Sequence, residues 1–313
     1  MTAAAPHGES SAASRIAVLI PCFDEAPTIA KVVADFRREL PDAVVYVFDN
    51  NSSDGSAELA RAAGAVVIPE KKQGKGHVVA AMLEQVEAEY YVMVDGDDTY
   101  PADRARDLLR PVMAGEADLV VASRRAENQQ AAYRRFHVLG NWLVRTMINL
   151  IFGADLRDIM SGYRAFGRDF ARNLPVMAYG FDIETEMIVQ CLYRKWLIRE
   201  VPVQYRARPT GSASKLNTFS DGLRVIFRIL SLFRSYKPLT FFGGLAILFF
   251  LAAFGLAAAV WFGAWAPQSG YRLGFIVLSA TLLAMSLIAA SIGVIVQLIN
   301  FRFLELDSVL RRR

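Results

Sequence analysis

The sequence contains few of the residues that build disulfide frameworks or zinc clusters. Its 313 residues include only two cysteines, Cys22 and Cys191, and three histidines without metal-ligand spacing. Two cysteines so far apart indicate reduced, packed thiols rather than a disulfide scaffold. Such thiols are typical of a domain in the cytoplasm.

Two further absences exclude classes of function. The net charge is only +4, and no block of Lys and Arg interleaved with aromatic residues indicates a nucleic-acid groove, so we expect no nucleic-acid partner. No G-x-G-x-x-G motif follows a predicted strand, which argues against nicotinamide binding. Residues 1–14 are rich in Ala and Ser and have no apolar run. We therefore expect a disordered tail there and not a signal peptide.

Charge is absent from two long stretches near the C-terminus, Leu239–Phe262 and Leu273–Ile299. Each exceeds the roughly 20 residues that cross a bilayer core, and their length argues against the alternative of buried soluble helices. Basic residues flank the pair on both sides, at Arg228, Arg234 and Lys237 and at Arg302 and Arg311–Arg313. The positive-inside rule then predicts a membrane hairpin with both ends in the cytoplasm.

The segment before the hairpin has an amphipathic pattern. Over Asn217–Tyr236, polar and basic residues recur on one stripe while the other faces are apolar. This pattern favours a helix lying in the membrane interface, although a helix packed on the globular domain would also show it. The predicted organisation is a tail (1–14), a globular domain (15–212), an interfacial helix (213–237), a transmembrane hairpin (238–300) and a basic tail (301–313).

Before the hairpin, apolar runs alternate with amphipathic segments. The predicted strands are Arg15–Ile20, Ala43–Phe48, Ala65–Ile68, Tyr90–Val94 and Asp118–Ala122, with helices over 26–40, 53–63 and 76–89. This alternation indicates an α/β, Rossmann-like domain with a mostly parallel sheet covered on both faces. Charged residues follow four of the strands: Asp24-Glu25, Asp49, Asp95–Asp98 and Arg124. Because ligands of such sheets bind beyond the carboxyl ends of the strands, these residues predict a site.

Asp95-Gly96-Asp97 follows the fourth predicted strand directly. Two carboxylates separated by a small residue can reach one hard cation, so we expect Mg²⁺ or Mn²⁺ here. Such a cation leaves positions for phosphate oxygens and would neutralise charge on a leaving nucleotide diphosphate. Asp98 is interpreted as a solvated neighbour or as the cap of a helix beginning at Pro101.

Other rim residues suit a nucleotide. Pro21 makes a rigid turn before Asp24 and Glu25, which could accept hydrogen bonds from ribose hydroxyls or could cap the following helix. Asp49 could accept from the imide N–H of uracil or guanine. Gly74-Lys75-Gly76 opens a helix and could bind an anion, although it is not a Walker loop. Cations suited to phosphate follow the strands and the later loop: Arg124, Arg134, Arg135, Arg164, Arg206, Arg208 and Lys215.

Together these segments resemble family 2 glycosyltransferases with the GT-A fold. The matching pieces are IPCFDE (20–25), FDNNSSDGS (48–56), GKG (74–76), DGDDTYP (95–101), ASRR (122–125), DIMSGYRAF (158–166) and EVPVQYRARPTGSASKL (200–216). Within the family the chain is most similar to the dolichol- or polyprenyl-phosphate sugar transferases. Its RPTGSASK ending (208–215) is one residue longer than the R-x-x-G-x-S-K form of that group.

The resemblance implies roles for particular residues. Asp95 and Asp97 would bind the metal, and Asp24, Glu25 and Asp49 the nucleoside. Arg124, with Arg134 or Arg135, would contact phosphates, and Arg208 and Lys215 would close over the donor. Asp158 and Glu186 match acidic positions near the reacting centre, and relatives often carry Gln where this chain has Thr99. Gln190, Arg194 and Trp196 do not form the Q-x-x-R-W of processive synthases, which favours transfer of a single sugar.

We therefore expect a metal-dependent, inverting transferase that moves a sugar from a UDP- or GDP-sugar to a polyprenyl phosphate. A phosphate acceptor is already anionic and needs no strong base, so Asp158 could orient it, whereas a hydroxyl acceptor would need Asp158 as its base. The alternatives are a glycolipid or saccharide acceptor, or a non-catalytic scaffold that binds nucleotide-sugar. We expect a multi-pass protein of the inner membrane, with the catalytic domain and both termini cytoplasmic, whose hairpins could associate as a homo-oligomer.

Overall fold

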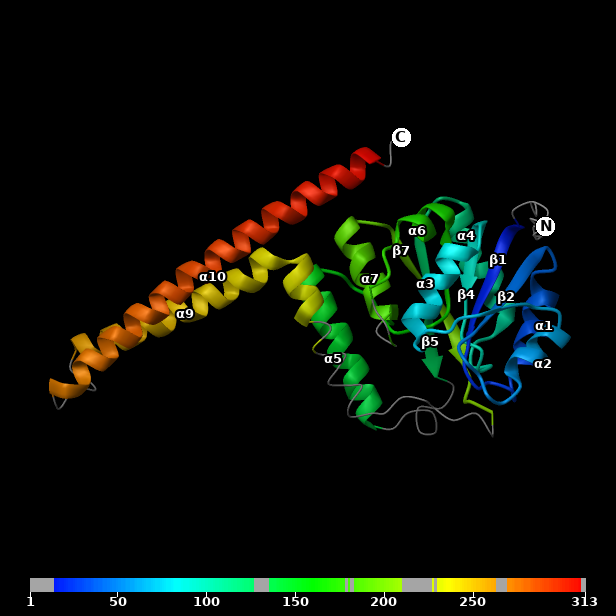
Figure 1. The fold of residues 1–313 in the computed structure, drawn as a ribbon, viewed down its shortest axis with the longest axis horizontal. Coiled ribbons are helices and arrows are strands. Elements are labelled where there is room, and N and C mark those ends of the chain that lie inside the picture. The colour runs from blue at the N-terminus through cyan, green and yellow to red at the C-terminus, as the bar shows by residue number, and fades with distance from the viewer. Residues whose placement is uncertain are drawn as a thin grey trace, which may run out of the picture. The chain divides into compact units, whose positions relative to one another are not determined.

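The computed structural model describes residues 14–126, 135–177, 180, 183–209, 227, 230–262 and 269–310. The chain divides into two compact units, Met1–Val225 and Ile226–Arg313, and each is considered by itself. The first unit is an α/β domain, and the second is a pair of long helices (Figure 1).

A seven-stranded sheet in the order β3-β2-β1-β4-β6-β5-β7 forms the centre of the first unit. The strands are β1 (Ser14–Cys22), β2 (Ala43–Asp49), β3 (Val66–Pro69), β4 (Ala88–Met93), β5 (Leu119–Ala126), β6 (Arg164–Gly167) and β7 (Ile198–Tyr205). All neighbours pair in parallel except β6, which runs antiparallel between β4 and β5. The mostly parallel α/β sheet is thus confirmed, and β6 and β7 are strands for which the sequence analysis predicted no element.

The predicted strands are present, with shifted ends. β1 begins at Ser14, which was assigned to the tail, and continues through Pro21 to Cys22, so Pro21 does not end it. Pro21 and Cys22 stay in register with Phe48 and Asp49 of β2. The apolar runs form strands because both faces of the sheet are covered, which leaves no side for polar residues.

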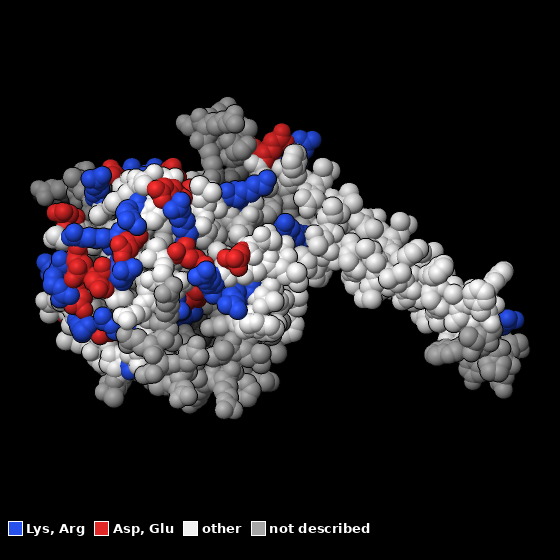
Figure 2. Space-filling view, turned by 180° about the vertical axis from the view of Figure 1, so that it is seen from behind, with Lys and Arg blue, Asp and Glu red and all other residues white. Residues whose placement is uncertain are grey.

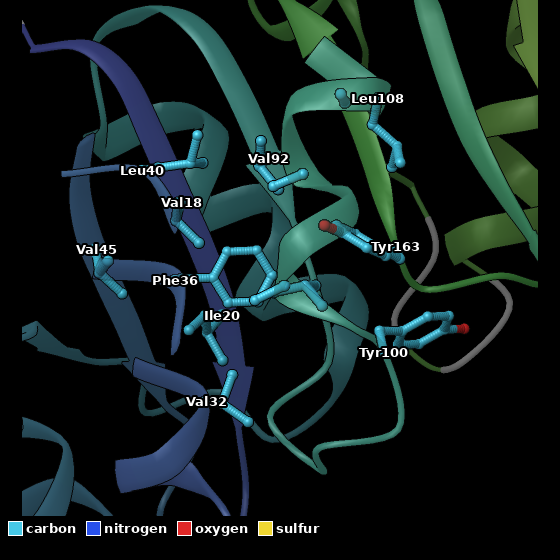
Figure 3. Close-up of a cluster of buried hydrophobic side chains, with 14 of the residues drawn as sticks. Val18, Ile20, Val32, Phe36, Leu40, Val45, Val92, Tyr100, Leu108 and Tyr163 are labelled. Carbon is cyan, nitrogen blue, oxygen red and sulfur yellow. The ribbon is translucent and has the colours of Figure 1, made fainter. Parts of the chain in front are cut away.

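Helices cover both faces of the sheet: α1 (Ile29–Glu39), α2 (Ser56–Ala62), α3 (Lys75–Gln85), the short helix η1 (Ala102–Arg104), α4 (Ala105–Met113), α5 (Arg135–Phe152), α6 (Arg168–Asn173) and α7 (Ile183–Arg194). On one face Phe36 of α1 packs edge-on against Tyr163, which in turn contacts Tyr100 (Figure 3). On the other face Phe166 of β6 stacks on Tyr91 and meets Phe170 of α6. The aromatic contacts on the first face reach the loop after β4 and so connect the core to the site.

The second unit contains α9 (Pro238–Trp261) and α10 (Ser269–Leu310), which lie side by side (Figure 1). Ser279 and Ser286 of α10 donate hydrogen bonds to the carbonyls of Ala253 and Ala246 on α9. By length and composition both helices could cross a membrane. The visible face of this pair carries charged side chains only near its ends (Figure 2).

Two predicted boundaries need correction or stay open. Residues 301–310 are not a separate tail, because α10 continues as one helix to Leu310. Helical periodicity simply extends past the apolar run, and Arg302 and Glu305 pair along the same helix. Most of the predicted interfacial helix, 213–237, lies outside the described residues, although 230–236 are helical.

Candidate functional site

Residues at the carboxyl ends of β1, β2, β4 and β5 carry the candidate site. Asp24 follows β1, Asp49 ends β2, Asp95 and Asp97 follow β4, and Arg124 lies in the last half of β5. β2, β1 and β4 are parallel neighbours in the sheet, so their carboxyl ends meet at one edge. Such an edge is where open α/β sheets bind ligands.

Asp95 is held by a cation from α3. The Lys75 ammonium lies 2.6 Å from Asp95 Oδ1, and its side chain is only 11% exposed. The same ammonium also pairs with Glu184 in the first turn of α7. Burial lowers the pKa of Lys75, but the charges of Asp95 and Glu184 outweigh this effect. The pKa is therefore raised above its ordinary value, and the amine stays protonated. Lys75 thus links the half-buried carboxylate of Asp95 to the buried carboxylate of Glu184.

Asp97 has a different set of partners. Its Oδ1 accepts hydrogen bonds from the hydroxyl of Thr99 at 2.6 Å and from the Thr99 N–H at 3.2 Å. Its Oδ2 lies 2.7 Å from Arg208 Nη2. Thr99, at the position where relatives were expected to carry Gln, therefore fixes the rotamer of Asp97.

The two aspartates differ in their pKa values. Burial raises the pKa of Asp97 and the charge of Asp95 raises it further, against the lowering effect of Arg208. Burial also raises the pKa of Asp95, but the Lys75 charge and hydrogen bond outweigh it and bring the pKa below its ordinary value. Two carboxylates that repel each other in a buried site form a donor set that a divalent cation would fit, because the cation neutralises both.

The cation would need further ligands from elsewhere. Over the part of the chain that the structure describes, His, Cys, Asp and Glu side chains form no group of three or more that could hold a metal ion. Two aspartates leave most positions of a six-coordinate shell to oxygens of water or of a phosphate. The metal site of Asp95 and Asp97 therefore stays a prediction.

The wall beside Asp95 is formed by a glycine. A Cβ built on Gly162, two residues before β6, would lie 2.6 Å from Asp95 Cγ. Real Cβ atoms do not approach other atoms so closely, so only glycine leaves Asp95 in its observed position. The sequence analysis quoted Gly162 within DIMSGYRAF without giving it a role.

Asp49 presents a carboxylate oxygen without a partner. Its Oδ1 is buried and has no hydrogen-bond partner among the described residues, while Oδ2 accepts from the Ser52 N–H at 3.4 Å. An orphaned buried acceptor costs free energy unless a ligand satisfies it. This geometry fits the expected contact to an imide N–H.

The loops beside Asp49 hold each other in place. Asp24, at φ 50°, accepts a hydrogen bond from the Ser53 N–H at 2.7 Å, so its carboxylate joins the β1 loop to the β2 loop. Glu25 is buried, and its carbonyl accepts the N–H of Ile29 at the start of α1. Asn50 donates to two carbonyls and accepts the Gly74 N–H at 2.8 Å, which fixes the loop before Lys75.

Asp98 lies in a different arrangement from the one expected. Its carboxylate pairs with Lys31 of α1 at 2.8 Å, and its φ of 56° is left-handed. Its side chain caps neither η1 nor α4, and the cap position of η1 is Pro101. Asp98 therefore ties the β4 loop to α1.

Arg124 and Asp158 form a two-pronged ion pair. Arg124 Nε and Nη2 lie 2.7 and 2.9 Å from the two carboxylate oxygens of Asp158. The Arg124 N–H donates to the same carboxylate, and the guanidinium lies over the ring of Tyr205, 5.3 Å from its centroid. Asp158 thus orients Arg124, in a geometry characteristic of Arg–carboxylate pairs.

Glu184, which the sequence analysis did not select, pairs with Lys75, and the predicted Glu186 lies two residues further along α7. The Glu186 carboxylate is fully buried and accepts from the Met177 N–H and from Gln190, both at 3.1 Å. Residues two apart on a helix do not share a face, so only one of the two can contact Lys75. The sequence spacing gives no signal for which one.

Three predicted site residues cannot be placed. Arg134 and Lys215 lie outside the described residues, and Arg135 begins α5 but its side chain is likewise not described.

Arg164 is fully buried and donates to the carbonyls of Ser161 and Ile159, so it is a structural cation and not a surface one.

Comparisons with known proteins identify the class. The fold resembles that of glucosyl-3-phosphoglycerate synthase from Mycobacterium tuberculosis, solved with Mn²⁺, UDP-glucose and phosphoglyceric acid. The TM-score is 0.58 at 22% identity, over 70% of this chain and 80% of that one. Residues 17–174 match the profile of glycosyl transferase family 2. The chain belongs to this family and is a glycosyltransferase.

Two relatives narrow the resemblance. Glycosyltransferase AglJ of Haloferax volcanii is 37% identical over 246 residues, which cover 78% of this chain and 80% of that protein. The dolichyl-phosphate hexose transferase of the same organism is 28% identical over 210 residues, covering 67% and 90%. The chain thus resembles the polyprenyl-phosphate sugar transferases within its family.

Proposed function

We propose that this glycosyltransferase moves one sugar from a nucleotide-sugar to a polyprenyl phosphate at the cytoplasmic face of the inner membrane. The observation that carries the proposal is the arrangement of Asp95 and Asp97 beside the cations Lys75, Arg208 and Arg124. Two long apolar helices in the same chain support a lipid-linked acceptor. The relative that transfers hexose to dolichyl phosphate supports the same acceptor class.

The donor would bind along the edge from β2 to β4. Asp49 Oδ1 would accept the imide N–H of the base, and the β1 loop at Pro21, Asp24 and Glu25 would contact the nucleoside. Asp95 and Asp97 would hold Mg²⁺ or Mn²⁺, which supplies positive charge to the departing diphosphate. Lys75 and Arg208, already beside the two aspartates, would bind diphosphate oxygens as charge builds there.

The acceptor would need orientation more than activation. A phosphate monoester is anionic at neutral pH, so its oxygen can attack the anomeric carbon without losing a proton to the enzyme. Both oxygens of Asp158 already receive N–H groups of Arg124, which favours an orienting role for Asp158 over that of a base. Direct attack by one nucleophile predicts inversion at the anomeric carbon.

The hairpin would hold the chain at the lipid surface where the acceptor resides. Arg234 and Lys237 precede α9, and Arg302 follows the apolar part of α10, so the positive-inside rule favours both ends on the cytoplasmic side. A helical pair of this kind gives a multi-pass anchor with the catalytic unit in the cytoplasm.

The test is transfer of labelled sugar from a panel of UDP- and GDP-sugars to a polyprenyl phosphate in vesicles that contain the full chain. We expect a labelled lipid that forms only with a divalent cation and is lost in Asp97→Asn. Exposed Glu116→Gln is the matched control and should retain activity. Label in a glycolipid or saccharide, with none in lipid phosphate, would replace this acceptor by the hydroxyl alternative. Binding without any transfer would favour a scaffold.

A further inference from the structure

The loop of residues 156–163, between α5 and β6, contacts both halves of the site. Its Asp158 pairs with Arg124, and its Gly162 lies against Asp95. The position of this loop therefore determines where the Asp158 carboxylate lies relative to Arg124. It also determines how close Gly162 lies to Asp95.

The loop is anchored at its far end by an aromatic side chain and a buried cation. The hydroxyl of Tyr100 accepts the Gly162 N–H at 3.0 Å, and Arg164 donates to the carbonyls of Ile159 and Ser161 at 2.8 and 2.9 Å. These contacts hold residues 159–162. Asp158, which carries the orienting carboxylate, is held by a different residue.

That anchor is Glu200 on β7, opposite Val121 of β5 in the sheet register. Its Oε1 accepts the N–H groups of Asp158 at 2.8 Å and of Arg157 at 2.9 Å, and its Oε2 lies 3.0 Å from the Arg157 nitrogen. One carboxylate thus receives two consecutive main-chain N–H groups directly at the residue that pairs with Arg124. Hydrogen bonds to a charged acceptor are stronger than those to a neutral one.

We propose that Glu200 is a positioning residue of the transfer reaction, which holds Arg124 toward the phosphate substrate through the main chain of Arg157 and Asp158. The inference rests on the proposed function for the identity of that substrate. Both Glu200 and Tyr205, over whose ring the Arg124 guanidinium lies, belong to β7, so one edge strand supports the guanidinium from two sides.

A purely structural anchor would look similar in the structure, so the test must separate the two roles. The variants are Glu200→Ala, which removes the acceptor, and Glu200→Gln, whose amide oxygen can still accept both N–H groups. Glu116→Ala is the control, because Glu116 pairs with Arg199 on the same strand, away from the loop. Each is measured in the full-length protein and combined with Arg124→Ala.

Three readouts are taken: thermal unfolding, hydrogen exchange of residues 155–163, and kcat and KM for transfer to a polyprenyl phosphate. We expect Glu200→Ala to speed exchange in this segment and to lower kcat/KM by about 10- to 100-fold, since small misplacements near reacting groups cost this much. Glu200→Gln should retain activity within about threefold, since its amide oxygen keeps both N–H contacts.

The decisive result is the double variant. If Glu200 acts through Arg124, adding Glu200→Ala to Arg124→Ala should cost no further activity, because coupled residues are not additive. Additive losses, or equal damage by Glu200→Ala and Glu200→Gln, would overturn the proposal. If the wild-type protein transfers no sugar to lipid phosphate, the proposed function fails, and the same cycle is run on affinity for UDP and GDP. Absence of coupling there would also overturn the positioning role.

Discussion

Asp95 and Asp97, which follow β4, are held in position by different neighbours. Asp95 is fixed from one side by Lys75 and meets Gly162 on the other, whereas Asp97 is fixed by Thr99 and Arg208. A substitution at Gly162 therefore acts on Asp95 without removing any polar group. This makes Gly162 a sensitive probe of the site.

Gly162→Ala should displace the Asp95 carboxylate, because the added carbon would lie 2.6 Å from Asp95 Cγ. We expect Mn²⁺ affinity and turnover each to fall by about 100-fold, the size of effect that misplacements of roughly 1 Å produce. Mn²⁺ binding is measured by electron paramagnetic resonance and turnover by sugar transfer.

Gly167→Ala, at the other end of β6, is the matched control for this variant. Its added carbon would meet Val112 at 3.6 Å, an ordinary contact, so both measurements should stay near wild type. Unchanged Mn²⁺ affinity in Gly162→Ala would contradict the assignment of Asp95 as a metal ligand.

Among residues, the sequence allowed prediction of those that follow strands but not of those that depend on packing. Asp95, Asp97 and Arg124 come after apolar runs, so their place at the sheet edge follows from the pattern. Glu184 and Glu200 lie in the first turn of α7 and in edge strand β7, and only tertiary contacts bring them to Lys75 and to the 156–163 loop. Choosing Glu184 over Glu186 required the rotation of α7, which spacing alone does not give.

At the scale of elements, the loops after β1 and β2 are cross-linked by polar side chains. Asp54 accepts the Ala26 N–H at 2.9 Å, the Ser56 N–H at 3.0 Å and the Ser56 hydroxyl at 2.5 Å. Ser56 in turn accepts the Glu25 N–H at 2.8 Å, so the start of α2 is joined to the predicted nucleoside loop.

These contacts predict a pH-dependent contribution of Asp54 to stability. Burial raises its pKa, but the hydrogen bonds from Ser56 and Ala26 together lower it more, and the pKa lies below its usual value. A depressed carboxyl pKa stabilises the fold above the unfolded-state value and loses this effect as pH falls through the folded-state pKa.

We therefore expect Asp54→Ala to lower the free energy of unfolding by about 1 kcal/mol at pH 7, as for lost helix-start hydrogen bonds. The difference from wild type should shrink as the pH is lowered below about 4, the usual carboxyl range. Urea unfolding of both proteins at several pH values measures it. A deficit independent of pH would show that the charge of Asp54 contributes nothing.

Short or charged elements were the ones that escaped sequence analysis. β6 has four residues and begins with Arg164, a charge that hides any strand pattern, yet it is buried in the middle of the sheet. Its burial is tolerated because loop carbonyls receive the guanidinium, a contact that no local pattern encodes. In β7 the exposed residues Arg199, Pro202 and Gln204 interrupt the apolar run, as suits an edge strand.

For the molecule as a whole, the two native cysteines make the membrane topology measurable. Cys22 and Cys191 are both buried, and burial raises the pKa of Cys22 to about 12 and that of Cys191 above its ordinary value, so neither thiol ionises readily at neutral pH. A cysteine introduced on the surface should therefore dominate labelling by a maleimide that does not cross membranes.

In sealed vesicles, Trp261→Cys at the end of α9 and Glu305→Cys near the end of α10 should be labelled from opposite sides. The reason is that residues 261 and 305 flank the apolar part of α10, which could span the bilayer. Labelling of both from one side would contradict the hairpin. The wild-type protein, treated identically, gives the background of Cys22 and Cys191.

Helix α10 has one more consequence, which concerns the thickness of the lipid. Its charge-free stretch, Leu273–Ile299, is about 40 Å long at the helical rise, against roughly 30 Å for a bilayer core. A transmembrane helix longer than the bilayer core must tilt or extend beyond it, and the tilt angle changes with the length of the acyl chains. In the proposed transmembrane arrangement, the tilt of α10 would depend on acyl-chain length, so bilayer thickness would influence which membrane the enzyme occupies.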